Sequence, residues 1–507
     1  MNGYSFLSVS FPLCLAGLLL LYHLFPRRCR PVLLLLFSVL LYASEGVYAL
    51  LFLFGVILSV WAGGLWLGTY TAKEKAALQA QGLTRDAKKQ IKKQFNRTRS
   101  YILWAVLGLN FAVLALTKFP LLPRGGRLVM PLGLSFFMFQ ALGYLIDVKM
   151  GKIAAEKNLL RFALFVSFFP QLIQGPIGRY KDLTPTLFAG EKPSAADTKA
   201  GLMRLVTGYI KKLVLADRLT AALTLLWADT QSGAAVALGA VLYAFRLLWD
   251  FSGGIDIALG AARMLGITMA ENFRAPYLSR NLEEYWTRWH ISMGSWFRDY
   301  IFYPANMAPR MLRFSAKMRE RFRTGFFTRV PLYISLLLTW LATGVWHGNS
   351  WNFVLWGLTN GLILMLSEEL RPARERLYAK RPGWKASALR TVLVTARTFL
   401  LLCLIRLWDC YPDPAAVLAA LGRLFTAFSA APLPALGLNV PDLVLLGLGL
   451  VATFVYDRRL YADRPLALSR CPDTVYYPVL ICFILLVLLF GKYGIGYNAA
   501  DFIYGKF

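Results

Sequence analysis

The chain has 507 residues, of which 57% are hydrophobic and only 16% are charged, whereas an ordinary soluble domain is nearer a quarter charged. This excess of apolar residues excludes a typical water-soluble globular protein. The formal net charge of +29 would fit a nucleic-acid partner, but the basic residues lie in short blocks between apolar runs. That distribution is typical of membrane proteins and predicts a lipid bilayer, not nucleic acid, as the partner.

Apolar runs that approach the ~20 residues needed to cross a bilayer core recur along the chain. They predict an all-α, multi-pass integral membrane protein with roughly eleven to thirteen helices entering the membrane. Without an internal repeat or a low-complexity region, we expect one domain over residues 1–507. The clearest runs are residues 5–24, 31–67, 101–122, 330–346, 351–366, 391–407, 443–455 and 477–490.

The first runs and the basic clusters predict a topology. Arg27, Arg28 and Arg30 follow the first run without a small-residue cleavage site, which indicates a retained helix. Ser44, Glu45 and Gly46 interrupt residues 31–67 and predict a two-helix hairpin. Basic residues outnumber acidic ones in three short loops, so the positive-inside rule places these loops in the cytoplasm and both termini outside. The loops are residues 73–99, 310–329 and 371–390, with nine, seven and seven Lys or Arg.

Polar residues interrupt the apolar pattern between residues 131 and 281. Irregular backbone at membrane depth persists only where protein or a water-filled cavity surrounds it. Short reentrant helices are one interpretation, and the wall of a substrate passage is the other. The passage is favoured because ionisable groups at membrane depth are costly; the polar residues concerned are Gln171, Gln174, Arg246, Asp250 and Asp256.

The chain has three histidines, and the positions of two of them make them candidates for a functional role. His23 closes the first apolar run beside arginines, where an interfacial histidine needs no function. His347 lies between two apolar runs and is flanked by Trp346 and Trp351, so it is either an interfacial residue at a turn or a general base, with the two interpretations about even. His290 lies in a segment that, written as one amphipathic helix, carries it on an apolar face at the cytoplasmic interface, where a packing role is favoured.

The sequence lacks the motifs of several other kinds of binding site and enzyme. The six cysteines have no metal-ligand spacing, so neither disulfides nor a metal site is expected. The phosphate-binding, dinucleotide, zinc-protease and hydrolase-elbow motifs do not occur. A secondary transporter remains open, because discontinuous helices are also typical of transporters.

Four stretches taken together resemble one family, the membrane-bound O-acyltransferases, and within it the AlgI branch of alginate O-acetylase membrane subunits. The ordered set is specific, although each motif alone is weak, and the end of the chain at 502–504 is similar too. The stretches are 131–140 with Ile146 and Asp147; 168–177; 250–258 continuing through 271–273, 276–277 and 289–292 to 296–300; and Trp346-His347-Gly348 with Trp351 and 353–357.

The resemblance implies a ring of helices around a thinned centre, where a cytoplasmic tunnel meets an external funnel. It divides the domain into N-terminal helices 1–122, an acyltransferase core 131–366 and C-terminal helices 391–507. It makes His347 the catalytic histidine and His290 the second one. The substrate-binding candidates are Trp346, Asp256, Arg298, Gln174 and Asn281.

The implied reaction moves an acyl group, acetyl in the first instance, from a cytoplasmic thioester to a hydroxyl of a cell-envelope polysaccharide or of an intermediary protein. No cofactor is expected to stay bound; acetyl-CoA is the expected donor substrate, and an exported or membrane-anchored protein with an SGNH-hydrolase fold is the expected partner. On the charge-based topology, His290 lies on the inner, donor side and His347 in the outer half. We expect His347 to deprotonate the acceptor hydroxyl.

Two departures from the AlgI pattern leave the acceptor open. Residues 305–309 replace a glycine-rich turn, and Asn360 stands where a histidine is frequent. D-alanyl transfer to teichoic acid by a DltB-like protein and non-enzymatic lipid or glycan transport are the alternatives.

Overall fold

The computed structural model describes residues 6–8, 10–80, 82–121, 126, 128–228, 232–428, 436–464 and 468–493. Contacts group this part of the chain into two units. One unit contains the described residues up to Leu205, Gly254–Ala270 and Tyr493, and the other contains Val206–Gly253 and Glu271–Lys492. The similarity at residues 502–504 lies outside the described residues.

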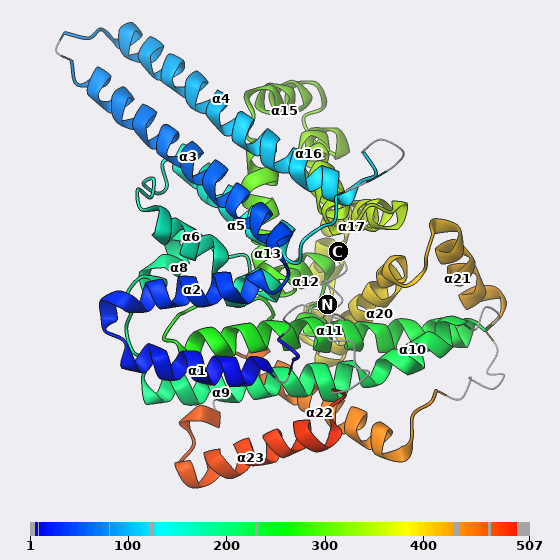
Figure 1. Cartoon of the computed structure of the whole chain (residues 1–507). Helices are drawn as coiled ribbons and strands as arrows, with labels where there is room; N and C mark the ends of the chain where they lie inside the picture. Colours follow the sequence, from blue (N-terminus) through cyan, green and yellow to red (C-terminus); the bar gives the residue numbers. More distant parts are fainter. Residues whose placement is uncertain are drawn as a thin grey trace. The chain divides into compact units, whose positions relative to one another are not determined.

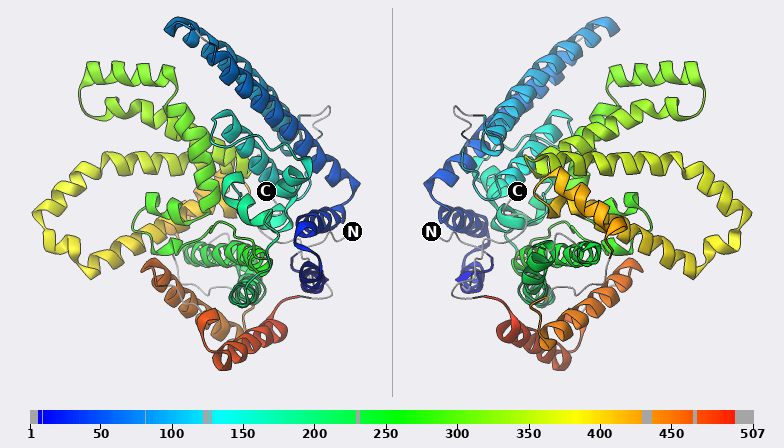
Figure 2. Two further views of the ribbon diagram at one scale, coloured as in Figure 1. Left: turned by 90° about the vertical axis from the view of Figure 1, so that its left-hand side faces the viewer. Right: turned by 90° about the vertical axis from the view of Figure 1, so that its right-hand side faces the viewer.

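The first four helices of the first unit overlap the apolar runs that the sequence predicts, and four more follow in the region where polar residues interrupt the pattern. α3 and α4 are long and run side by side (Figures 1 and 2). The predicted break at residues 44–46 is confirmed, because α2 ends before it and α3 begins after it with Gly46 at φ 106°. The helices are α1 (Ser10–Leu24), α2 (Arg30–Ala43), α3 (Val47–Leu78), α4 (Arg85–Lys118), α5 (Leu134–Lys149), α6 (Leu159–Ser167), α7 (Phe169–Gln174) and α8 (Tyr180–Leu187).

Two helices pass from one unit into the other, α9 (Ala195–Tyr209) and α11 (Gly233–Met264). A π-helical segment, Ile210–Ala216, continues α9. The second unit holds the remaining helices: α10 (Arg218–Ala228), α12 (Leu282–Arg288), α13 (Ile291–Phe297), α14 (Tyr303–Asn306), α15 (Pro309–Phe322), α16 (Phe326–His347), α17 (Trp351–Glu369), α18 (Arg371–Lys380), α19 (Pro382–Ala386), α20 (Ala388–Cys410), α21 (Pro414–Thr426), α22 (Val440–Tyr461) and α23 (Asp473–Phe490).

Seven helices of the described chain are long and apolar enough to cross a membrane, or eight if the bent pair α17 and α18 is one span. They are α3, α4, α11, α16, α20, α22 and α23. This confirms an all-helical integral membrane protein. The number is below the eleven to thirteen membrane-entering helices expected, because several apolar runs form helices too short for the criterion, such as α1 and α21.

The pair α16 and α17 positions the site. Gly344 and Gly357 face backbone atoms of the opposite helix, Phe353 O and Trp340 O, closely enough that an added Cβ would collide with them. Small residues at such a contact let two membrane helices approach closely. The helices are therefore held together near the end that carries His347.

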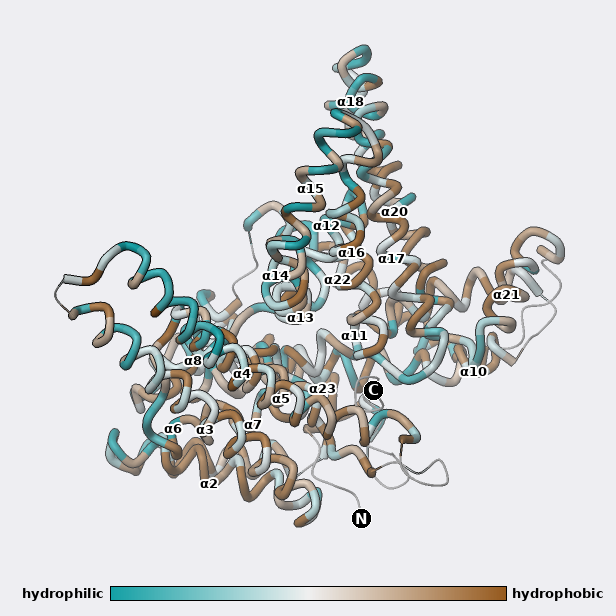
Figure 3. Tube along the Cα trace, turned by 90° about the horizontal axis from the view of Figure 1, so that it is seen from above, coloured by the Kyte–Doolittle hydropathy of each residue, from teal (hydrophilic) through white to brown (hydrophobic). Residues whose placement is uncertain are grey.

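The other end of this pair is charged. Arg329 of α16 donates two hydrogen bonds to the carboxylate of Glu369 on α17, at 2.8 and 2.5 Å. Figure 3 shows hydrophilic residues along α15 and α18, which adjoin this end in sequence. Two of the three predicted cytoplasmic loops, 310–329 and 371–390, thus meet at one end of one helix pair. Since α16 rises about 1.5 Å per residue, Arg329 and His347 are roughly 27 Å apart along it.

Candidate active site

His347 is the last residue of α16, and its side chain is only 5% exposed. Its ring lies 4.8 Å from the rings of both Trp346 and Trp356, and it stacks on Phe353 at 6.3 Å between centroids. Gly348 follows because the Phe353 ring occupies the space where a Cβ would be. Aromatic rings therefore enclose this imidazole, so His347 also contributes to the packing between α16 and α17.

His290 does not lie on one continuous amphipathic helix, which corrects the sequence interpretation. α12 ends at Arg288, Trp289 is extended and forms an antiparallel bridge with Phe273, and His290 has the left-handed backbone values φ 47° and ψ 51° before α13 begins. A left-handed non-glycine residue costs on the order of 1–3 kcal/mol and persists only where its surroundings hold it. Here the bridge and the contacts of Asn272 break the helix.

Asn272 sets the state of the His290 ring. Its Oδ1 accepts hydrogen bonds from the backbone N–H and the hydroxyl of Ser292, at 2.9 and 3.0 Å. His290 Nδ1 lies 3.2 Å from the amide Nδ2 and 3.3 Å from Oδ1. Because Oδ1 already accepts two hydrogen bonds, we assign Nδ2 as the donor to His290 Nδ1. Burial, with the nearby Arg406 charge as a second cause, lowers the pKa of His290 to about 3. His290 is thus neutral near pH 7 and carries its proton on Nε2, as a hydrogen-bond donor.

The ring of Trp346 lies close to the rings of both histidines. Its ring lies 6.2 Å from that of His290 and 4.8 Å from that of His347. His290 therefore lies close to the end of α16 that carries His347, and the expected separation of the two histidines onto opposite sides of the membrane stays a prediction. Only the start of the segment is near the charged end, where Glu283 in the first turn of α12 pairs with Arg371 at 3.6 Å. The seven residues of α12 then lead about 10 Å from that end toward the histidines.

Arg406 on α20 is the residue of this site that the sequence interpretation missed. Its guanidinium lies over the rings of Trp289 at 5.0 Å and Trp356 at 6.0 Å. It donates to the Tyr285 hydroxyl at 2.9 Å and pairs with Asp409 at 3.1 Å. The available signal was an arginine and an aspartate at the end of the apolar run 391–407, because intramembrane charges are costly and mark functional sites.

Two further predicted residues of this unit have other local partners. Asn281 caps α12, and its side chain accepts a hydrogen bond from the backbone N–H of Glu284 at 2.8 Å. Arg298 is 54% exposed and lies 3.3 Å from the Asp299 carboxylate. The structure therefore brings Trp346, but neither of these two, into contact with both histidines.

The predicted residues Gln174 and Asp256 belong to the other unit. Asp256 accepts a hydrogen bond from Arg204 at 2.9 Å. Gln174 is 1% exposed, and neither of its amide atoms makes a hydrogen bond with the part of the chain that the structure describes. A buried amide without a protein partner suits a substrate passage, so Gln174 stays the stronger candidate of the two.

Two polar residues that the sequence singled out have packing partners. Asn360, which replaces a frequent histidine, accepts a hydrogen bond from Trp286 Nε1 at 3.1 Å and donates one to the backbone carbonyl of Trp356, one turn earlier on α17, at 2.9 Å, so it attaches the Trp286 indole to α17. The Asp250 carboxylate pairs with Lys212 at 2.6 Å, and both side chains are fully buried. Among the described residues, no group of three or more His, Cys, Asp or Glu could hold a metal ion.

Parts of the chain match proteins of one known family. Residues 152–316 match the family model of the membrane-bound O-acyltransferase family. The chain is 33% identical over 360 residues to a protein of Azotobacter vinelandii named "probable alginate O-acetylase AlgI", covering 69% of this chain and 66% of that protein. It is also 33% identical over 352 residues to the protein of the same name from Pseudomonas putida, covering 69% and 67%.

A peptidoglycan O-acetyltransferase of Helicobacter pylori is 29% identical over 327 residues, which cover 55% of this chain and 58% of that protein. The matches to the AlgI proteins span about two thirds of their length. The helical membrane fold and these matches define the class as membrane O-acyltransferases. The chain belongs to the membrane-bound O-acyltransferase family, in its AlgI-like branch.

Proposed function

We propose that this chain transfers an acetyl group from a cytoplasmic thioester to a hydroxyl of a cell-envelope polysaccharide or of an intermediary partner protein. The observation that carries the proposal is the convergence of His347 and His290 on Trp346, in a buried aromatic site of a chain from this family. The basic residues at the far end of α16 and α17 support a catalytic end that faces away from the cytoplasm.

His347 acts as the general base. It takes the proton of the acceptor hydroxyl while the hydroxyl oxygen bonds to the thioester carbonyl carbon, and the carbonyl oxygen becomes an oxyanion. When the tetrahedral intermediate collapses, the carbon–sulfur bond breaks. The thiolate then leaves and takes the proton back from His347, so the products are the ester and the free thiol.

His290 stabilises the oxyanion. Its Nδ1 is occupied by the amide of Asn272, which leaves Nε2–H as the donor. A neutral donor held in a buried site costs no reorganisation when charge develops on the carbonyl oxygen, and one such donor contributes about 10²–10³ in rate. This role replaces the assignment of His290 to packing.

Arg406 acts as a positioning residue. It lies against Trp356, which contacts His347, and against Trp289, which precedes His290. Its cation also favours negative charge developing nearby. The pair with Asp409 fixes its orientation.

Donor, acceptor and partner are proposed at the level of chemical class. Acetyl-CoA is the donor, and an SGNH-type exported protein is the partner that completes transfer to the polysaccharide. The names of the relatives above indicate different acceptors, alginate in one case and peptidoglycan in another. The relatives therefore do not determine the acceptor polymer of this chain.

The test combines gene deletion with a donor assay. Ester-linked acetate on envelope polysaccharide should disappear on deletion and return with the native gene but not with His347→Ala. Membranes containing the protein should consume labelled acetyl-CoA and not a D-alanyl-loaded carrier protein. Consumption of the D-alanyl donor alone would establish the teichoic acid alternative, and consumption of neither would favour a transporter.

A further inference from the structure

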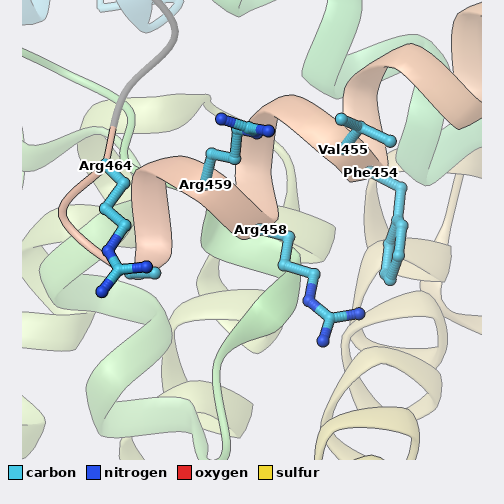
Figure 4. A pocket seen from close by; sticks show the side chains of 6 residues that line it. Phe454, Val455, Arg458, Arg459 and Arg464 are labelled. Atoms are coloured by element: carbon cyan, nitrogen blue, oxygen red, sulfur yellow. The ribbon is translucent and has the colours of Figure 1, made fainter.

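A pocket of about 390 Å³ lies at the C-terminal end of α22, within the second unit (Figure 4). Its lining combines two kinds of residue. Arg458, Arg459 and Arg464 supply positive charge, and Phe454 and Val455 supply apolar surface one turn earlier on the helix. The acyl-transfer site described above uses none of these residues.

Within the described part of the chain, no acidic side chain pairs with the three arginines. None of the three guanidinium groups makes an ion pair or hydrogen bond with a described residue. The nearby carboxylate of Asp463 is paired with Arg274. Three arginines with free donors suit a phosphate group, because the guanidinium fork binds its oxygens in pairs.

The apolar half of the pocket faces the bilayer. α22 is a candidate membrane span, and only 11% of its most apolar window is buried within the protein. Phe454 is 54% exposed and Val455 is 45% exposed. Each precedes an arginine by four residues, so Phe454 and Arg458 follow one another along one stripe of the helix and Val455 and Arg459 along the adjacent stripe (Figure 4). Acyl chains would lie along Phe454 and Val455 while a phosphate reaches Arg458 and Arg459.

Contacts place the pocket at the charged end of the second unit. The Tyr461 hydroxyl donates to Glu284 at 2.9 Å, and the neighbouring Glu283 pairs with Arg371 at 3.6 Å. The arginine end of α22 therefore lies near the loop 371–390, which the charge pattern assigns to the cytoplasm. This is the level at which phospholipid headgroups of the inner leaflet lie.

We propose that this pocket binds an anionic phospholipid of the inner leaflet, with the headgroup phosphate on the three arginines and the acyl chains along Phe454 and Val455. A soluble phosphate compound would use only the arginines. The apolar, bilayer-facing half is what favours the lipid.

The test is native mass spectrometry of the purified full-length protein, titrated with phosphatidylglycerol or phosphatidylcholine. R458Q/R459Q/R464Q should weaken phosphatidylglycerol binding on the order of a hundredfold, from about a fivefold loss for each basic residue. R376Q/K380Q/R381Q, at the end of α18 and the residue after it, removes the same charge away from the pocket and should leave this binding unchanged. Equal losses in the two variants would overturn the proposal in favour of diffuse attraction.

A second variant tests the lipid itself. F454S/V455S keeps all the charges and should weaken phosphatidylglycerol binding several-fold, so unchanged binding would show that acyl chains do not lie there. Coenzyme A and inorganic phosphate serve as competitors and should not displace the lipid at equal concentration. Displacement by coenzyme A would assign the arginines to the acyl donor, displacement by phosphate would assign them to a soluble anion, and either result would overturn the lipid assignment.

Discussion

The two ends of the α16 and α17 pair differ in the kind of interaction that holds them. At one end Arg329 and Glu369 form a partly exposed ion pair among basic loops. At the other end His347 is enclosed by aromatic rings and adjoins the segment of His290. The hairpin of α16 and α17 therefore has a charged end, which suits orientation in a membrane. Its other end holds the buried histidine that we propose as the general base. Substitutions at the two ends should have unequal effects on transfer.

The largest loss should follow removal of His347. His347→Ala and His347→Gln should both lower acyl transfer about a thousandfold, within the ~10²–10⁴ range of general-base catalysis. The glutamine variant fills most of the space and separates packing from chemistry. Transfer rates normalised to folded protein, measured by gel-filtration yield, provide the check. Substantial activity in His347→Gln would remove the proposed base.

His290 comes next. His290→Ala should lower transfer about a hundredfold, less than His347→Ala, because it removes a donor and not the base. Since the pKa of His290 is lowered to about 3, His290 does not titrate between pH 5 and 8. The acid limb of the pH–rate profile should therefore persist in His290→Gln. If that limb disappeared, the roles of the two histidines should be exchanged.

Arg406 should have a smaller effect on rate, but its single variant has a folding problem. Arg406→Gln leaves Asp409 buried without its cation, which costs about 3–5 kcal/mol. The double variant R406Q/D409N removes both charges and should regain yield and thermal stability. Its transfer should still be about tenfold below native, and Arg406→Lys should recover part of that loss. Full activity in the double variant would reduce Arg406 to a structural ion pair.

Substitutions at the charged end of α16 and α17 should affect acyl transfer least. Arg329→Gln removes a partly exposed ion pair, worth about 0–1 kcal/mol, and should change the transfer rate less than twofold. Thermal unfolding in detergent measures the first effect and the donor assay the second. A loss comparable to that of His290→Ala would break the contrast between the two ends.

The sequence predicts the membrane class and the helix boundaries around His347, because apolar runs and the residues between them are local signals. It leaves His347 with two even interpretations, and only the resemblance to the acyltransferase family favours a general base there. The local pattern fails at His290, where the helical periodicity of residues 286–300 is overridden by Asn272, which lies 18 residues earlier in the chain. Nothing in that periodicity indicates a left-handed residue.

The closeness of both histidines to Trp346 was also beyond the sequence. Counting charges places loops but cannot tell that α12 leads from Arg371 toward Trp346. The sequence did not identify Arg406 for a different reason. A charged residue at the end of an apolar run does not indicate which rings it contacts, here those of Trp289 and Trp356. The grouping of Gln174 and Asp256 with the histidines stays a prediction.

The central claim is that the catalytic end of α16 and α17 faces away from the cytoplasm. Single cysteines in an otherwise cysteine-free, active protein test it with a membrane-impermeant thiol reagent. Ser315 and Ala386 mark the basic end, and Ala80 marks the basic loop of the other unit; Asn349 follows the catalytic residue and is exposed. Ala430, expected outside from the charge pattern, lies outside the described residues and serves as an independent external position.

The account predicts that Asn349→Cys reacts in intact cells, whereas Ser315→Cys, Ala386→Cys and Ala80→Cys react only after permeabilisation. Asn349 is about 30 Å along the helix axis from Arg329, close to the thickness of a bilayer core. Labelling of Ser315→Cys in intact cells, with Asn349→Cys protected, would invert the hairpin and contradict an external route to His347.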